Sequence, residues 1–392
     1  MLRRWFVVSR PTDVVLELAS LVLTLLAFLF ALTLLIAVHE YGHYRMALAW
    51  GVPVMVFSIG FGKTIYQWRP QKQRPGQNTE FRIGALPLGG FIQMLDGRES
   101  DVPQDQRHMA FDQKSLMARA SIVAAGPLAN LLLAAVLFSA LAWWGHPKVL
   151  PIIGRVEVGA AADKAGLQPG DLVLTVDSQE VRDSQHLRSL IRGDDETQEA
   201  DKDTGQFAPV KMVWEIDRQG NRLSLTVVPV LSPVPGPPTS SPIRRIGAVV
   251  GVPSETEWVR AGFWDGLGLG FSQVKQIALM TGQLLGKMLT GEATSKHLSG
   301  PLTIAEQAGQ SAQRGLFAYT SFLALISVSL GLLNLLPLPM LDGGHLMYYL
   351  WESLTGKPVS VAWQRGLQKV GLALLIFIMS LAFFNDLTRL FN

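Results

Sequence analysis

The sequence contains no cysteine among its 392 residues. This absence excludes disulfide bonds, thiolate metal ligands and cysteine nucleophiles, so any metal ion must be bound by nitrogen and oxygen atoms. Charged residues are also scarce, at 17% of the chain, and the formal net charge is only +3. No strong basic field is therefore present, and the composition does not favour a nucleic-acid partner.

Apolar residues, in contrast, make up 48% of the chain, and its mean hydropathy is +0.26. These values are typical of a membrane protein. Four apolar runs are long enough, or nearly so, to cross a bilayer as helices. The first follows the basic segment Met1–Arg10, but it is too long for a signal peptide and lacks a small-residue cleavage site, so we expect a retained span. The four predicted spans are Val14–Val38, Ile122–Trp144, Thr320–Leu336 and Val370–Leu387.

A polar insert of about 80 residues, Val149–Leu231, separates the second and third predicted spans. Its alternating segments "VKMVWEID" and "RLSLTVVP", joined by "RQGN", predict a β-hairpin. A short helix is expected at Ser184–Arg192, followed by an acidic loop. The proline-rich stretch Ser232–Pro242 predicts a stiff linker. Beyond it, Trp258–Leu289 has the mixed apolar and basic pattern of a helix on the membrane surface.

The first span ends in "LIAVHEYGHY", which contains the pattern H-E-x-x-H. On a helix His39 and His43 share one face, so both imidazoles can reach one zinc ion at about 2.0–2.1 Å. Glu40 stands beside them and can accept a proton from water. The alternative is a pair of histidines at the membrane interface. Ionisable residues that border a span usually mark a functional site, and this position favours metal binding.

A third ligand is expected from another polar residue at membrane depth. Asp342 follows the Pro337-x-Pro339 break and precedes Gly343-Gly344. A broken helix is tolerated at this depth only where its backbone is buried in protein or lines a watery cavity, so Asp342 is the leading candidate. His345 is a rival ligand. The alternative is that these residues simply end the span at the interface.

Several motifs occur in an order that resembles one known family. "AVHEYGHY" and "NLLPLPMLDGG" resemble the site-2 protease family of intramembrane zinc proteases, and the similarity continues through "FSIGFGK", "PLGGFIQMLD", "AAGPLANLLLA" and "LSGPLTIAEQAG". The resemblance covers nearly the whole chain. It implies that His39, His43 and Asp342 bind Zn²⁺ and that Glu40 is the general base.

The resemblance also implies how the substrate is held. Asn334 would lie beside the zinc ion and hydrogen-bond the substrate backbone or the developing oxyanion; a helix-packing amide is the alternative. The segment Thr79–Leu95 is expected to form a hairpin that turns at Pro87–Gly90. In the family this hairpin re-enters the membrane and adds to the substrate as a strand, which makes Gly89, Gly90 and Phe91 candidate substrate contacts; an ordinary cytosolic hairpin is the alternative.

Two further segments have expected roles. Gly126 and Asn130, in "AAGPLAN", are interpreted as packing residues of the catalytic core and not as ligands. Within the insert, Pro151–Val181 resembles a PDZ domain, a module that captures chain termini or extended strands and that can also serve as a steric gate. Similar bacterial proteins usually carry two such modules in tandem, whereas this chain has room for one.

The sequence therefore predicts a polytopic α-helical membrane protein with about four transmembrane helices, a re-entrant β-hairpin and an inserted α+β PDZ domain. Its predicted function is zinc-dependent endoproteolysis, within the bilayer, of single-span membrane proteins such as anti-sigma factors and of remnant signal peptides. A non-catalytic membrane scaffold built around the PDZ domain is the alternative, and a transporter is weaker because no internal repeat is visible. The predicted parts are residues 1–145, 149–231, 232–316 and 317–392.

The expected location is the bacterial inner membrane, with the PDZ domain and both termini in the periplasm and residues 46–114 facing the cytoplasm. This orientation follows from the family resemblance alone. The lysines and arginines near the span ends are balanced between the two sides, so charge does not decide it.

Overall fold

The computed structural model describes residues 11–73, 77–98, 101–193, 210–232, 243–251, 256–291 and 300–391. The chain forms two compact units. One unit joins Met1–Trp143 to Ala261–Asn392 and contains the long helices, and the other is the insert, Trp144–Arg260.

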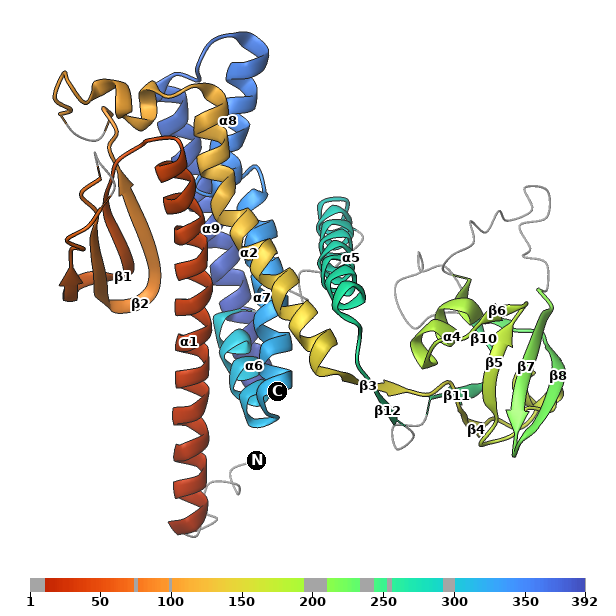
Figure 1. Cartoon of the computed structure of the whole chain (residues 1–392). Helices are drawn as coiled ribbons and strands as arrows, with labels where there is room; N and C mark the ends of the chain where they lie inside the picture. The colour runs from red at the N-terminus through yellow and green to blue at the C-terminus, as the bar shows by residue number, and fades with distance from the viewer. Residues whose placement is uncertain are drawn as a thin grey trace. The chain divides into compact units, whose positions relative to one another are not determined.

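Four helices of the first unit are long and apolar enough to cross a membrane, as the sequence predicts. Each helix is longer than its predicted span. The first continues without a break through His39 and His43, so the H-E-x-x-H residues are held rigidly inside a helix (Figure 1). The four helices are α1 (Pro11–Ala49), α2 (Leu116–Trp144), α7 (Leu316–Leu335) and α9 (Val361–Phe391).

Shorter helices complete this unit. The helix α6 (Pro301–Gln313) packs along α1, and a Cβ on Gly309 would lie only 2.0 Å from the Thr24 hydroxyl. Most of Trp258–Leu289, the segment predicted to lie on the membrane surface, forms the helix α5 (Phe263–Leu289), whereas its first two residues belong to a strand. It packs on the end of α2, where the Trp143 ring stacks on Phe263. Two single turns precede α2, namely η1 (Arg107–Met109) and η2 (Phe111–Gln113).

The predicted proline break separates α7 from α8 (Asp342–Thr355). Because proline has no N–H and restricts the residue before it, the helix ends ahead of Pro337 and Pro339. The chain then folds back so tightly that a Cβ on Gly343 would lie 2.1 Å from the Leu336 carbonyl oxygen. Asp342 is thereby fixed in the first turn of α8.

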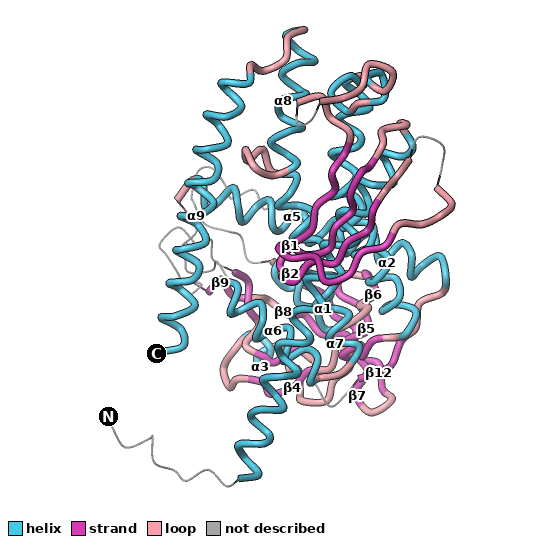
Figure 2. Tube along the Cα trace, turned by 90° about the vertical axis from the view of Figure 1, so that its left-hand side faces the viewer, coloured by secondary structure: helices cyan, strands magenta, loops and turns pink. Residues whose placement is uncertain are grey.

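Two long antiparallel strands, β1 (Val54–Trp68) and β2 (Glu80–Met94), lie beside the C-terminal half of α1 (Figures 1 and 2). Residues 56–59 of β1 pair with residues 80–83 on one side and with residues 90–93 on the other. The expected hairpin within Thr79–Leu95 is therefore wrong in its pairing. Its two arms flank β1 and do not contact each other as partners, because β1 supplies backbone hydrogen bonds to both.

The two edges of this sheet differ in their surroundings. Residues 64–68 form the outer edge and pair with residues 81–84. Residues 90–94 form the inner edge, next to α1. A Cβ on Gly90 would lie 2.9 Å from Ile36 Cγ2 and 3.2 Å from Glu40 Cγ, so only glycine allows the strand to approach the helix this closely.

The insert is a separate α+β unit with its own core, which includes Ile153, Leu187 and Trp214. The predicted helix at Ser184–Arg192 and the hairpin around "RQGN" are confirmed. The unit does not end at Leu231 but extends to Arg260, because residues 248–250 pair with the strand that contains Ile153. The acidic loop and most of the proline linker lie outside the described residues.

The central sheet of the insert has the strand order β6-β5-β7-β8, and the remaining strands form pairs. The elements of the insert are β3 (His146–Val149), β4 (Ile153–Val156), α3 (Ala161–Lys164), β5 (Leu172–Val176), β6 (Gln179–Glu180), α4 (Ser184–Arg192), β7 (Met212–Arg218), β8 (Asn221–Val227), β9 (Val230–Ser232), β10 (Ile243–Arg245), β11 (Ala248–Val250) and β12 (Thr256–Val259).

A buried carboxylate joins the last span to α6. Asp386 of α9 is 3% exposed and accepts hydrogen bonds from the backbone N–H groups of Gly300, Leu302 and Thr303 and from the Thr303 hydroxyl. These N–H groups are the unpaired donors at the start of a helix, so Asp386 caps α6 from another helix.

We expect Asp386→Asn to lower the midpoint of thermal unfolding of the detergent-purified chain by several degrees. A buried amide presents one acceptor and one donor where two acceptors are needed, and each lost hydrogen bond to a carboxylate costs about 1.5–3 kcal/mol. Arg389→Ala is the matched control, because it breaks an ion pair to Glu306 between the same helices that is half exposed and worth less than about 1 kcal/mol. Equal shifts for the two variants would contradict the capping role.

Candidate metal centre

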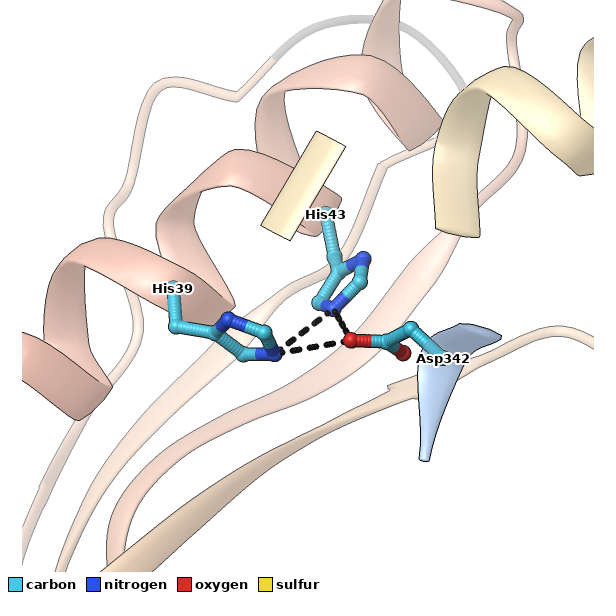
Figure 3. Close-up of side chains that lie close together, drawn as sticks. All are labelled: His39, His43 and Asp342. Carbon is cyan, nitrogen blue, oxygen red and sulfur yellow. Dashed lines mark hydrogen bonds and ion pairs between the residues drawn. The ribbon is translucent and has the colours of Figure 1, made fainter. Parts of the chain in front are cut away.

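The side chains of His39, His43 and Asp342 converge, although 299 positions separate Asp342 from His43 in the sequence (Figure 3). His39 Nε2 lies 3.1 Å from Asp342 Oδ2 and 3.2 Å from His43 Nε2. His43 Nε2 lies 3.6 Å from the same carboxylate oxygen. This is the predicted set of ligands, brought together from α1 and α8.

The three atoms fit a tetrahedral zinc ion. Zn–N and Zn–O bonds of about 2.0–2.1 Å at tetrahedral angles place neighbouring ligand atoms about 3.3 Å apart. The three separations, from 3.1 to 3.6 Å, lie close to this value. Two imidazoles and one carboxylate are also ligands that zinc prefers, and a set of three leaves the fourth position for water or substrate, as in catalytic zinc sites.

Helix α2 provides the space and the hydrogen bonds that orient both histidines. Ile122, Gly126 and Asn130 are spaced four residues apart and therefore share one face of α2. The Ile122 carbonyl oxygen lies 2.8 Å from His43 Nδ1, so this nitrogen donates and Nε2 is left for a metal ion. A Cβ on Gly126 would lie 2.2 Å from His43 Nε2, so the histidine ring occupies the space that a side chain would take.

The position of Asp342 depends on how α8 is anchored. Arg119 of α2 forms a two-point ion pair with Glu352 of α8, at 2.6 and 3.2 Å, and its guanidinium lies over the Tyr349 ring.

At the other end of α8, burial raises the pKa of Asp342, but hydrogen bonds with His39 and His43 outweigh this effect and lower the pKa to about 2. The carboxyl group is therefore ionised, as a metal ligand must be.

A cavity of about 310 Å³ opens beside these three residues and contains Glu40. Glu40 also receives a hydrogen bond from the Ile92 backbone N–H on the inner edge of the β1–β2 sheet. The carboxylate of Glu40 is thus placed between the metal-binding group and a β-strand edge. The cavity is lined by His39, Glu40, His43, Gly90, Phe91, Ile92, Met94, Asp96, Arg98, Phe111, Val123, Asp342, His345 and Tyr349.

The other predicted site residues differ in whether they line the cavity. Gly90 and Phe91 line the cavity, whereas Gly89 faces the Phe61 ring, which its Cβ would overlap. His345 lines the cavity but is not part of the metal-binding group, and burial lowers its pKa. Asn334 is half buried in the last turn of α7 and is not among the lining residues.

Sequence reasoning did not identify a charged pair at the cavity wall. The Arg98 Nε atom donates to Asp96 Oδ1 at 2.9 Å, and the guanidinium lies over the Phe111 ring. Asp96 is buried, so this pair adds two charged groups to a wall that already contains Glu40 and His345. The only available signal was the position of "LDGR" directly after the glycine-rich strand, and such charges usually belong to solvent-exposed loops.

We expect Gly126→Ala to weaken zinc binding by the purified chain by at least about tenfold, because the added methyl group displaces the His43 ring from its position. The measurement is competition with a chromophoric zinc chelator. Gly268→Ala on α5 is the matched control, since its Cβ meets no atom within 4 Å and its zinc affinity should equal that of the parent. Parent-like affinity in Gly126→Ala would refute the steric argument.

Comparison with known proteins shows the family to which the chain belongs. The sequence model of peptidase family M50 matches residues 27–378. The chain is 33% identical to the regulator of sigma-E protease RseP of Escherichia coli K12, over 93% of the chain and 98% of that protein. It is 33% identical to the regulator of sigma E protease of Haemophilus influenzae over the same shares. It is 34% identical to a Ralstonia nicotianae protein provisionally named as a zinc metalloprotease, over 94% of the chain and 99% of that protein.

These alignments extend over 440 to 460 positions, more than the 392 residues of the chain, so the relatives contain stretches without a counterpart here. The family match nevertheless covers most of the chain, including both segments that supply the metal-binding group. The four apolar helices agree with a multi-pass membrane protein. The chain therefore belongs to peptidase family M50, the zinc metalloproteases of the site-2 type.

Proposed function

We propose that this zinc metalloprotease cleaves single-span membrane proteins within the bilayer, with His39, His43 and Asp342 as zinc ligands and Glu40 as the general base. The observation that carries this proposal is the arrangement around Glu40. Its carboxylate lies in one cavity with the three ligand atoms and beside the edge of a β-sheet.

A bound zinc ion supplies Lewis acidity, which makes water more acidic and polarises a carbonyl group. The residues of the chain supply the proton transfers. Glu40 accepts a proton from the attacking water and returns it to the departing amide nitrogen. The Ile92 N–H holds the Glu40 carboxylate toward the cavity while it does so.

The inner edge of the sheet is well placed to bind an extended substrate. Residues 90–94 pair with β1 on one side only, and no strand covers the other side among the described residues. Backbone groups of Gly90 and Ile92 point to the same side of this strand, because alternate residues of a strand share an edge. A substrate helix that unwinds can pair its backbone with this edge, which places a peptide bond next to Glu40.

The exposed side chains of the sheet are consistent with partial insertion into the membrane. Phe61, Ile65, Tyr66 and Trp68 are 41 to 71% exposed, although they are large and apolar or aromatic. A soluble protein rarely exposes such a patch, whereas a membrane interface favours these residue types. This observation supports the re-entrant position that the family resemblance implies.

The insert is proposed to be a PDZ-type domain that captures or filters the trimmed end of the substrate. A cavity of about 330 Å³ lies between helix α4 and the segment Ile243–Val250. Such a groove between a helix and a strand edge is suited to an extended peptide. We propose a periplasmic location for this domain and anti-sigma factors and remnant signal peptides as substrates, in an inner membrane.

Glu40→Gln is expected to retain zinc but to lose cleavage of a single-span test substrate by about 10²–10⁴-fold, because the amide cannot accept a proton from water. The assay follows both fragments of the substrate by mass spectrometry in detergent micelles. Glu306→Gln, at a half-exposed position on α6, is the control for the same chemical change and should cleave normally. Full activity of Glu40→Gln would refute the assignment of the base.

Asp342→Asn is expected to raise the dissociation constant for zinc by more than about tenfold, because loss of a direct ligand costs at least as much as loss of an outer-shell partner. The measurement is metal content after dialysis against a chelator, with Glu40→Gln as the comparison variant. If Asp342→Asn retains as much zinc as Glu40→Gln, the third ligand must be another residue.

A further inference from the structure

Asn130 is a fully buried residue of α2 with an incomplete set of hydrogen bonds. It is 0% exposed, and its Nδ2 atom lies 3.4 Å from His39 Nδ1. Its Oδ1 atom is buried and has no hydrogen-bond partner among the described residues. An unpaired buried acceptor costs about 1–3 kcal/mol, and such a group in a native structure needs an explanation.

The ligand geometry specifies that a hydrogen-bond acceptor should face His39 Nδ1. Both histidines direct Nε2 toward Asp342, so a metal ion bound there leaves each Nδ1 atom protonated and able to donate. His43 Nδ1 donates to the Ile122 carbonyl oxygen. Among the described residues, the only partner of His39 Nδ1 is the Asn130 amide, whose nitrogen is also a donor. Rotating the amide by 180° replaces this nitrogen with the unpaired oxygen.

We propose that Asn130 is a positioning residue for the metal centre: its Oδ1 atom accepts a hydrogen bond from His39 Nδ1, which orients the ring and keeps Nε2 available to zinc. Ile122 and Asn130 then serve His43 and His39 in the same way, from positions eight residues apart on one helix face. The proposal rests on the ligand set given above, which Asp342→Asn tests separately.

The test compares two substitutions of Asn130 that separate the loss of the hydrogen-bond acceptor from a change in side-chain packing. Asn130→Leu keeps a similar volume and removes the acceptor, whereas Asn130→Asp keeps acceptor oxygens and removes the donor. The control is Ser327→Ala, which deletes the hydrogen bond from Ser327 Oγ to the backbone oxygen of Asn130 and so loosens the contact between α7 and α2 without changing the amide. The full-length chain is purified in detergent micelles, and its dissociation constant for zinc is measured by chelator competition.

We expect Asn130→Leu to raise the dissociation constant by about 10–100-fold, the usual cost of losing an outer-shell partner of a metal-binding histidine. The dissociation constants of Asn130→Asp and Ser327→Ala should stay within about threefold of the parent value, because both variants keep an acceptor for the hydrogen bond from His39 Nδ1. The proposal is overturned if Asn130→Leu binds zinc like the parent, or if Asn130→Asp binds as weakly as Asn130→Leu.

A second measurement uses the unsubstituted protein and so does not depend on any variant folding. In the zinc-loaded chain labelled with ¹⁵N-histidine, the NMR spectrum should show His39 and His43 both protonated at Nδ1. A His39 ring protonated at Nε2 would overturn the proposal. Loss of zinc from Asp342→Asn together with this protonation pattern in the parent would support both the ligand set and the role of Asn130.

Discussion

The structure depends on placing two imidazole nitrogens and one carboxylate oxygen close enough together to bind one metal ion, inside a bundle of apolar helices. Ordinary side chains would hold the helices too far apart. A Cβ added to Gly42 of α1 would lie 2.3 Å from the Ala125 carbonyl oxygen of α2, so only glycine allows the two helices to approach this closely. Gly126 on the facing helix leaves room for the His43 ring. Close packing of small residues is the usual means of helix association in membranes, and here it also shapes the space for the metal ligands. Stability and metal binding therefore depend on the same contact.

The same constraint explains why Glu40, the proposed general base, lies next to a β-sheet. Glu40 follows His39 directly, so its side chain points to a neighbouring face of α1, away from α2 and toward residues 90–94. Gly90 allows that strand to approach the helix, and the Ile92 N–H reaches the carboxylate. In the proposed mechanism, a substrate that pairs with this edge meets Glu40 through the same backbone geometry that holds the Glu40 carboxylate in place. In this proposal, α1 supplies the reacting groups and the sheet orients the peptide bond.

Much of this arrangement could be predicted from local sequence patterns. The four spans follow from long apolar runs, and the pairing of His39 with His43 follows from helical spacing, because both signals are contained within one element. The partner of a distant segment is harder to infer. The pairing of β1 with both arms of β2 was missed, since strand alternation defines faces but not neighbours. The insert was also predicted to end too early, because β11 pairs with β4 after a proline-rich segment that resembles a domain boundary. Asn130 was interpreted as a packing residue, and its approach to His39 depends on the crossing of two helices that the sequence alone does not specify.

Hydrolysis among apolar helices also requires a path for water, and the cavity wall provides the polar groups for it. The side chains of His39 and Asp342 are 12 and 20% exposed, so the metal-binding group is partly accessible to solvent. Asp96 and Arg98 line the same cavity and form an ion pair, which adds polar surface to the wall without leaving an unpaired charge. The chain leaves α7 after Leu335 and enters α8 at Asp342, so this break between the helices ends at a residue of the metal-binding group. Solvent access to the metal-binding group therefore depends on this cavity, whose wall joins residues of α1 and the β1–β2 sheet to Asp342 at the start of α8.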